Sequence, residues 1–222
     1  MRTLYHLWLH PFSRKVRIVL AEKGLEFNLQ IEKVWERRTE FLALNPAGDV
    51  PVLVEPDGTT LSNSSVICEY LEEVYPSPTL LGTLSAGRAE ARRLAFWFDL
   101  KFFEEVTVNI AYEKLAKHLW KPGAPDSEKI RMGRDNLHRH LEYIGYLSVR
   151  RNWLAGDDLT CADLAAAAHL SVIDYLGDVP WAAHEDAKDW FSRLKSRASF
   201  QPLLSDQVAG LPPAENYVDL NF

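Results

Sequence analysis

The amino-acid sequence predicts a small α/β domain followed by an all-helical domain. Strand and helix signals alternate over the first third of the chain, whereas strand signals vanish beyond residue 84 and apolar residues recur there at helical spacing. Between these parts, the proline-containing stretch PSPTLLGT has the composition of a linker. We therefore expect a first domain at 1–76, a linker at 77–83, a second domain at 84–210 and a C-terminal tail at 211–222.

The composition is that of a globular protein with a sizeable core. Hydrophobic residues make up 47% of the 222 residues and charged residues 25%. A net charge of −6 argues against binding to nucleic acid, which favours a basic surface. No run approaches the roughly 20 apolar residues of a membrane span, and the first residues do not contain the apolar stretch typical of a signal peptide. Two distant cysteines, Cys68 and Cys161, suit a reducing compartment, so a cytoplasmic protein is expected.

Seven elements are expected in the first domain, in the order β-α-β-α-β-β-α. A strand over TLYHLWL leads to a helix over SRKVRIVLAEKG, where Ser13 is a good N-cap and Gly24 lies where a C-cap belongs. The stretch FNLQIEKV predicts a second strand with polar alternation, and TEFLALNP predicts a short helix that ends at a proline. Two further strands flank Asp57 and Gly58, a strong hairpin signal, and SVICEYLEEVY predicts the last helix.

The second domain is expected to consist of helices alone. The periodic stretch AGRAEARRLAFWFDLKFFEEVTVNIAYEKLAKHL predicts one long helix, and DSEKIRMGRDNLHRHLEYIGYLSVRR predicts another. DLAAAAHLSVIDYLG predicts a largely buried helix that opens with a capping box of Thr160 and Asp163. Loss of either capping residue should cost roughly 1 kcal/mol of stability. Two shorter helices, over EDAKDWFSRLKSR and FQPLLSD, precede an irregular tail.

Four stretches together resemble a known family. HPFSRKVRIVLAEKG, FLALNPAGDVPVLVE, LSNSSVICEYLEE and LAGDDLTCADLAAAAHL are similar to the first helix, the proline loop, the third helix and the folding motif of the cytosolic glutathione transferases. The likeness covers nearly the whole chain. It implies a thioredoxin-like N-terminal domain, an all-helical C-terminal domain, a symmetric homodimer and a site for glutathione.

The resemblance also implies which residues hold glutathione. Pro51 matches a cis-proline that turns the backbone of Val50 toward the ligand for strand-like pairing. Ser64 would hold the γ-glutamyl carboxylate at a helix start. Ser13 would donate a hydrogen bond to the sulfur and lower the pKa of the thiol, which makes it the candidate catalytic residue. Asn63 stands where active relatives usually carry a glutamate, so the affinity for glutathione is expected to be weaker.

Each of these residues also has a purely structural interpretation. Ser13 and Ser64 are both good helix N-caps, and Pro51 can shape the fold without a ligand. No cysteine stands at the start of the first helix, which argues against thiol-exchange chemistry. The histidines lack the spacing of metal ligands and the sequence contains no nucleophile elbow or P-loop, so no metal site is expected.

Several aromatic and charged stretches are not explained by a detoxifying enzyme. VWERR, RRNWLAGDDLTCADLAAAAHLSVIDYLGDVPW and the ending YVDLNF resemble one branch of the family, the bacterial glutathione-transferase-like proteins that bind FtsZ, the tubulin-like division protein. In that branch the fold serves as a binding scaffold. The resemblance implies partner contacts at Trp35, Arg139 and the tail around Asp219. The structural alternative is that Trp35 covers the sheet and the tail packs on the helices.

The leading hypothesis is therefore an FtsZ-binding regulator of cell division with weak or no conjugating activity. One alternative is an active Ser-type glutathione transferase that conjugates glutathione to a small electrophile. Another is a peroxidase or isomerase on the same fold, because fold alone does not define function.

Overall fold

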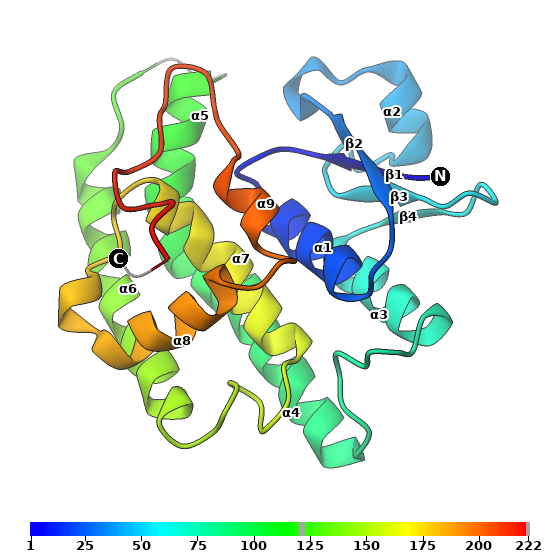
Figure 1. Cartoon of the computed structure of the whole chain (residues 1–222). Coiled ribbons are helices and arrows are strands. Elements are labelled where there is room, and N and C mark those ends of the chain that lie inside the picture. Colours follow the sequence, from blue (N-terminus) through cyan, green and yellow to red (C-terminus); the bar gives the residue numbers. More distant parts are fainter. Residues whose placement is uncertain (120–122, 221–222) are drawn as a thin grey trace.

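A four-stranded mixed sheet forms the N-terminal part of the molecule (Figure 1). The computed structural model describes residues 1–119 and 123–220. The strands lie in the order β2-β1-β3-β4, with β1 parallel to β2 and antiparallel to β3, and β4 antiparallel to β3. Their bounds are β1 Arg2–His6, β2 Phe27–Ile31, β3 Val52–Val54 and β4 Thr60–Ser62. The predicted hairpin is thus present between β3 and β4.

Alternating side chains place different helices on the two faces of this sheet. Leu4 and Leu53 belong to the main core, together with residues of α1 and α3. Tyr5 and Val52 point the other way and pack with Phe41 of α2 in a smaller cluster. The N-terminal helices are α1 Pro11–Glu22, the 3-10 turn η1 Val34–Glu36, α2 Thr39–Leu44 and α3 Ser64–Val74.

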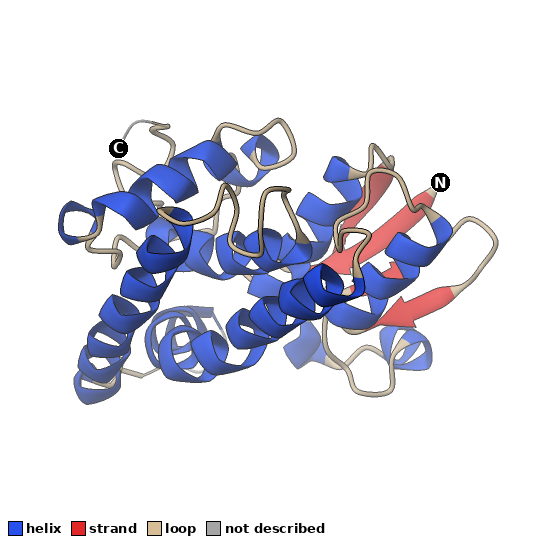
Figure 2. Ribbon diagram, turned by 90° about the horizontal axis from the view of Figure 1, so that it is seen from below, coloured by secondary structure: helices blue, strands red, loops and turns tan. Residues whose placement is uncertain are grey.

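Helices joined by loops form the rest of the described chain up to Leu204, two isolated bridges lie outside these helices, and Figure 2 shows the helices beside the strands. The predicted long helix is continuous from Ser85 to Leu119, but its middle segment is π-helical. Its last predicted residues are followed by residues 120–122, which lie outside the described chain. The bounds are α4 Ser85–Phe96, η2 Trp97–Tyr112, α5 Glu113–Leu119, α6 Ser127–Ser148, α7 Cys161–Tyr175, η3 Trp181–Ala183, α8 Glu185–Lys195 and α9 Gln201–Leu204.

Helix α7 is the centre of the molecule, as its alanine-rich sequence predicts. Every one of its residues is buried. It packs against α4 and η2 of its own half and against α1 of the N-terminal half, so one helix joins the two parts. Small side chains in AAAA allow neighbouring helices to approach closely on all sides.

The predicted capping box opens α7 and does more than cap it. The Asp163 carboxylate accepts hydrogen bonds from the Thr160 backbone N–H at 3.1 Å and from the Leu154 backbone N–H at 2.8 Å. It also accepts from the indole N–H of Trp190 on α8 at 3.0 Å. Asp163 is completely buried, so it joins a loop, α7 and α8 through one carboxylate.

The structure corrects the expected start of α1. The helix begins at Pro11, and its N-cap residue is His10, not Ser13. Proline is favourable at the first helical position because its missing N–H would have no partner there. Ser13 therefore lies inside the first turn, and its interpretation as an N-cap is wrong. At the other end, Gly24 follows the C-cap residue and has a φ of +66°, which agrees with the predicted glycine stop.

The N-cap of α3 is one residue earlier than Ser64, the N-cap of the structural interpretation. The N-cap is Asn63, whose side-chain oxygen accepts hydrogen bonds from the backbone N–H groups of Ser65 at 2.9 Å and Val66 at 3.4 Å. Ser64 is the first helical residue and is buried. Asn63 thus satisfies two of the free N–H donors at the start of the helix.

Residues 77–83, which were expected as a linker, are packed against the molecule. Leu80 and Leu81 are buried, and the Glu72 carboxylate of α3 accepts hydrogen bonds from the backbone N–H of both. The tail is irregular, as predicted, and its residues 221–222 lie outside the described chain. Within the described residues, no helix is long and apolar enough to cross a membrane.

Candidate functional site

A cavity of about 450 Å³ opens between the two halves of the molecule, and most of its lining is apolar. The N-terminal half contributes the loop after β1, the η1 turn and the residues before the cis peptide bond of Pro51. The helical half contributes α5 and the segment after α9. The principal lining residues are Trp8, His10, Trp35, Val50, Tyr112, Leu115, Leu119 and Val208. Such an apolar cleft with a few polar groups is typical of a small-molecule site.

His10 lines this cavity, whereas Ser13 lies behind it. Ser13 has no solvent-exposed surface, and its Oγ is 3.2 Å from Nδ1 of His10. The His10 ring also contacts Phe12, with 5.4 Å between the ring centroids. Any influence of the Ser13 hydroxyl on a ligand in the cavity must therefore pass through the imidazole. His10 was not among the residues predicted from the sequence, although Pro11 is a signal that the helix starts there.

The imidazole of His10 is neutral at physiological pH. Burial is the main reason, and the nearby His169 and His6 add to it; together they lower the pKa of His10 to about 3. A neutral imidazole has one N–H donor and one acceptor nitrogen. Because Nδ1 faces Ser13, the ring can present Nε2 to the cavity.

Of the other residues predicted to hold glutathione, Val50 lies in the cavity wall, whereas Asn63 and Ser64 do not. The Val50–Pro51 peptide bond is cis, as expected, and Val50 lines the cavity. Asn63 and Ser64 lie at the start of α3 and do not line it. The Asn63 side-chain oxygen already caps α3, so it is occupied by the helix in this structure.

A buried ion pair lies next to the start of α3. The Lys15 ammonium donates to the Asp99 carboxylate of η2, and the hydroxyl of Ser65 lies 3.2 Å from the same carboxylate. Burial alone would raise the pKa of Asp99, but Lys15 and His169 outweigh it and lower the pKa to about 2. Local sequence patterns do not predict this pair, because Lys15 and Asp99 are distant in the chain. It ties α1 to the π-helical segment.

A second buried cluster joins α1 to the C-terminal part of the chain. The Asp206 carboxylate accepts hydrogen bonds from Arg14 at 3.0 Å and from both terminal nitrogens of Arg17 at 2.7 and 2.9 Å. The Arg14 guanidinium also donates to the Tyr217 hydroxyl at 3.0 Å and to the Trp8 carbonyl at 2.7 Å. Asp206 directly precedes the segment that lines the cavity. One arginine thus contacts a cavity-lining residue, the residue that precedes the second lining segment, and the tail.

Tyr217 anchors the tail. Only 1% of its surface is exposed, and its hydroxyl donates to the Leu203 carbonyl at 3.0 Å. Its ring meets that of Tyr175 on α7 edge-on, with 5.1 Å between centroids. The tail therefore packs on the helices, as the structural alternative expected, while Val218 and Asp219 beyond the anchor are exposed.

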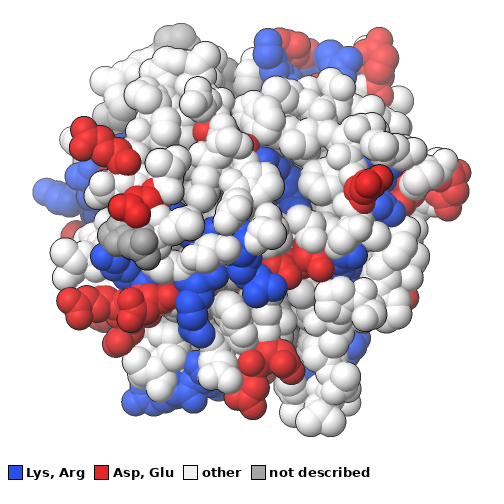
Figure 3. All heavy atoms as spheres, viewed as in Figure 1, with Lys and Arg blue, Asp and Glu red and all other residues white. Residues whose placement is uncertain are grey.

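The three predicted partner contacts lie on separate elements. Trp35 is half-buried in η1 and lines the cavity. Arg139 is exposed on α6, and Asp219 is exposed in the tail. Acidic and basic side chains are interspersed on the face shown in Figure 3, without a broad region of one sign. A partner that contacted all three residues would have to span both halves.

The two cysteines are poor nucleophiles. Burial raises the pKa of Cys68 to about 11 and that of Cys161 to about 12. Within residues 1–119 and 123–220, no group of three His, Cys, Asp or Glu side chains is placed to hold a metal ion.

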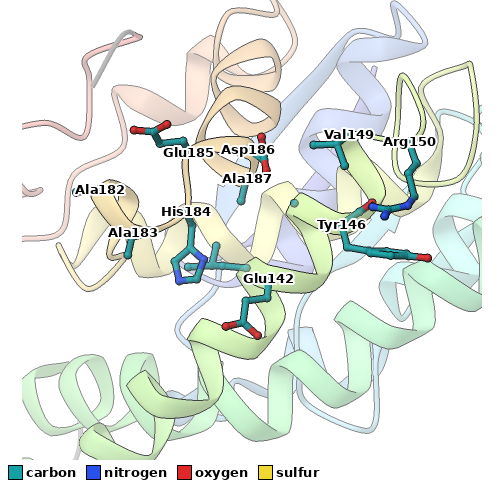
Figure 4. A pocket seen from close by; sticks show the side chains of 12 residues that line it. Glu142, Tyr146, Val149, Arg150, Ala182, Ala183, His184, Glu185, Asp186 and Ala187 are labelled. Atoms are coloured by element: carbon teal, nitrogen blue, oxygen red, sulfur yellow. The ribbon is translucent and has the colours of Figure 1, made fainter.

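A shallower groove lies between α6 and the start of α8, away from the cavity (Figure 4). Tyr146 and Arg150 form one wall, with the guanidinium carbon 3.8 Å from the ring centroid. His184 and Glu142 lie at its other end. None of the residues predicted to bind glutathione or a partner lines this groove.

His6, at the end of β1, makes stability depend on pH. It is completely buried, and neither ring nitrogen has a hydrogen-bond partner among the described residues. Burial, helped by Arg17, lowers the pKa of His6 to about 4. In the unfolded chain its pKa is about 6.5, so the unfolded state binds more protons between these values. The free energy of unfolding must therefore fall as the pH drops from about 6.5 towards 4.

We expect His6→Leu to remove this contribution, which is about 2 kcal/mol at pH 5 and close to zero at pH 7.5. Urea unfolding at both pH values measures it. Between pH 7.5 and pH 5, the free energy of unfolding should fall by about 2 kcal/mol less in the variant than in the wild type. An equal loss in the two proteins would show that His6 is not protonated more readily on unfolding.

Models of two protein domains match the chain. The N-terminal domain of glutathione S-transferases matches residues 11–74, and the C-terminal domain of glutathione S-transferases matches residues 126–198. Together with the sheet, the cis-proline and the central α7, these matches show that the chain belongs to the glutathione S-transferase family. The predicted fold class, a thioredoxin-like domain followed by an all-helical domain, is confirmed.

Individual members of the family are similar to this chain over its whole length. FtsZ-localized protein A of Caulobacter vibrioides is 49% identical over 224 residues, which cover 100% of this chain and 98% of that protein. The solved structure of FzlA from C. crescentus has a TM-score of 0.97 at 49% identity and covers 100% of this chain and 99% of that one. A glutathione S-transferase from Rhodospirillum rubrum F11 has a TM-score of 0.99 at 56% identity, with all of both chains covered.

Proposed function

We propose that this protein binds FtsZ polymers in the cytoplasm and regulates cell division as a scaffold. The observation that supports this most is the 49% identity to FtsZ-localized protein A, which extends over the whole chain and includes the tail. Glutathione S-transferase 3 of Zea mays and glutathione S-transferase F10 of Arabidopsis thaliana are 29% and 31% identical, whereas the Rhodospirillum rubrum protein of 56% identity is also named as a transferase. The chain is thus more similar to the division protein than to the two plant transferases.

The candidate catalytic residues support weak or no conjugating activity. Ser13 has no exposed surface, and the Asn63 oxygen is used by the N-terminus of α3. A ligand ammonium at Asn63 would meet a neutral amide already engaged in capping, which offers less than a free carboxylate. Both features favour the scaffold over an efficient Ser-type transferase.

The proposed contact surface consists of Trp35, Arg139 and Asp219. Tryptophan and arginine are the residues most enriched among binding hot spots. The buried Tyr217 holds the tail on the helices just before Asp219, so Asp219 projects from an anchored position. An anchored segment loses less conformational entropy on binding than a free one.

We expect Trp35→Ala to weaken co-sedimentation with FtsZ polymers at least tenfold, because truncation of a tryptophan hot spot costs about 2 kcal/mol or more. Arg139→Glu and Asp219→Lys should also weaken it. The matched control is Tyr146→Ala, which removes another partly exposed aromatic ring, in the groove of Figure 4. Tyr146→Ala should sediment like the wild type; if the other three variants do so as well, the proposed surface is wrong.

A second proposal is that the cavity binds glutathione, as a relic or a regulator of the scaffold. It is favoured by the cis bond before Pro51 and by the position of Val50 in the cavity wall. Titration calorimetry with glutathione up to millimolar concentration tests it.

We also propose a homodimer, because Val66 of α3 and Phe96 of α4 expose large apolar surfaces. Sedimentation velocity measures the oligomeric state directly.

A further inference from the structure

The loop between β1 and α1 places an imidazole, and not a hydroxyl, at the cavity. His10 lines the cavity together with Val50, the residue whose backbone is proposed to pair with glutathione. Ser13 is the residue expected to meet the sulfur, but it is completely buried on the far side of the ring. The two side chains are in contact through Oγ and Nδ1, 3.2 Å apart.

Three features make this imidazole suitable as a hydrogen-bond donor to an anion. It directly precedes Pro11, the first residue of a twelve-residue helix, whose N-terminal end has a positive potential. Phe12 packs against the ring and limits its rotation. The aromatic ring of Phe12 in turn meets His169 edge-on, with 5.1 Å between centroids, so the surrounding packing is fixed.

We propose that His10 is the residue that contacts the sulfur of a thiol ligand in this cavity, and that Ser13 positions its ring. This inference rests on the proposed binding of glutathione. In this arrangement Nδ1 is the acceptor for the Ser13 hydroxyl, 3.2 Å away, and the ring proton resides on Nε2. When the thiol ionises, its proton passes to solvent, and the thiolate accepts a hydrogen bond from Nε2–H. No proton is exchanged with the imidazole, which stays neutral throughout.

The charged and titratable groups around His10 are consistent with this neutral role. His6 on β1 and His169 on α7 both disfavour a positive charge on the ring. Lys33 and Asp49 line the same cavity with opposite charges. The donor is therefore available over the whole range in which a thiol titrates, about pH 6 to 10.

The test measures the pKa of the bound thiol in the full-length protein. Glutathione is added at saturating concentration, and the ultraviolet absorbance of the thiolate is followed from pH 6 to pH 10. S-methylglutathione, which has no ionisable thiol, reports the affinity for the rest of the ligand by calorimetry. Thermal unfolding confirms that each variant is folded.

We expect the wild type to lower the thiol pKa by about one unit, the size typical of one charge-assisted hydrogen bond. His10→Phe keeps an aromatic ring but removes the donor, so the thiol pKa should return to its free value. Calorimetry with S-methylglutathione reports separately how far the affinity for the rest of the ligand has changed. His10→Gln retains an N–H donor and should recover part of the shift. Ser13→Ala should reduce the shift without abolishing it, because the imidazole remains.

Three results would overturn the inference. In the first, His10→Phe keeps the full shift. In the second, Ser13→Ala abolishes the shift while His10→Phe does not, which would return the direct role to Ser13. In the third, the wild type binds neither glutathione nor S-methylglutathione. This last result leaves the FtsZ co-sedimentation unaffected, so the failure of this inference and the failure of the scaffold function are distinguishable.

Discussion

Asp206→Asn is expected to destabilise the protein by about 3–5 kcal/mol, the cost of leaving buried charges without their partner. The side chains of Arg14 and Arg17 are almost completely buried, and Asp206 is the carboxylate that both of them contact. The neutral amide has nearly the same shape, so the loss is one of charge and not of packing. Urea-induced unfolding at pH 7.5 measures the change.

The matched control for this variant is Glu69→Gln. Glu69 forms an equally direct ion pair with Arg92, but 41% and 43% of the two side chains are exposed. Solvent-exposed pairs contribute about 0–1 kcal/mol, so the control should be nearly as stable as the wild type. Limited proteolysis should also cut the tail of Asp206→Asn faster, because the Arg14 contact to Tyr217 depends on the same cluster. Equal stabilities of the two variants would refute the role assigned to Asp206.

The second large effect is expected from Asp163→Ala. A cap alone is worth roughly 1 kcal/mol, which was the expectation from sequence. In the structure, the carboxylate also satisfies the buried donors of Leu154 and Trp190. Each buried donor left without a partner costs about 1–3 kcal/mol, so we expect a total loss of about 4 kcal/mol in the free energy of unfolding.

Asp126→Ala separates the contribution of a helix cap from that of the buried contacts to Leu154 and Trp190. Asp126 caps α6 by accepting from the backbone N–H groups of Glu128 and Lys129, and those contacts are at the surface. Its loss should cost only the roughly 1 kcal/mol of a cap. If Asp163→Ala is no more destabilising than Asp126→Ala, the contacts to the loop and to α8 add nothing. Near-ultraviolet circular dichroism of Trp190 gives a second measure of the broken contact.

Local patterns in the sequence predicted most of the elements, because each depends on nearby residues. The hairpin at Asp57 and Gly58, the capping box at Thr160 and the buried α7 follow from turn chemistry, helix capping and periodic apolar residues. The π-helical character of η2 did not follow, since it is a departure from regular helix geometry that these patterns do not encode.

The candidate site was harder to predict, and the start of α1 shows why. Ser13 is by preference a far better N-cap than histidine, so propensity favoured the wrong residue. Pro11 decided the outcome, because it can occupy the first helical position and the chain then turns at His10. A shift of three residues moved the serine from the cavity to the interior. The buried partners of Lys15 and Arg14 depend on tertiary packing, which local patterns do not report.

The buried contacts of Arg14 and Arg17 with Asp206 and Tyr217 join residues that are synthesised at opposite ends of the chain. Arg14 and Arg17 emerge from the ribosome among the first residues, whereas Asp206 and Tyr217 are among the last. At roughly 5–20 residues per second, the first helix waits on the order of ten seconds or more for its counter-charge. During that time Arg14 and Arg17 lack the Asp206 carboxylate that pairs with both of them. The N-terminal half therefore completes its packing only after nearly the whole chain has been synthesised, although it is the first part to appear.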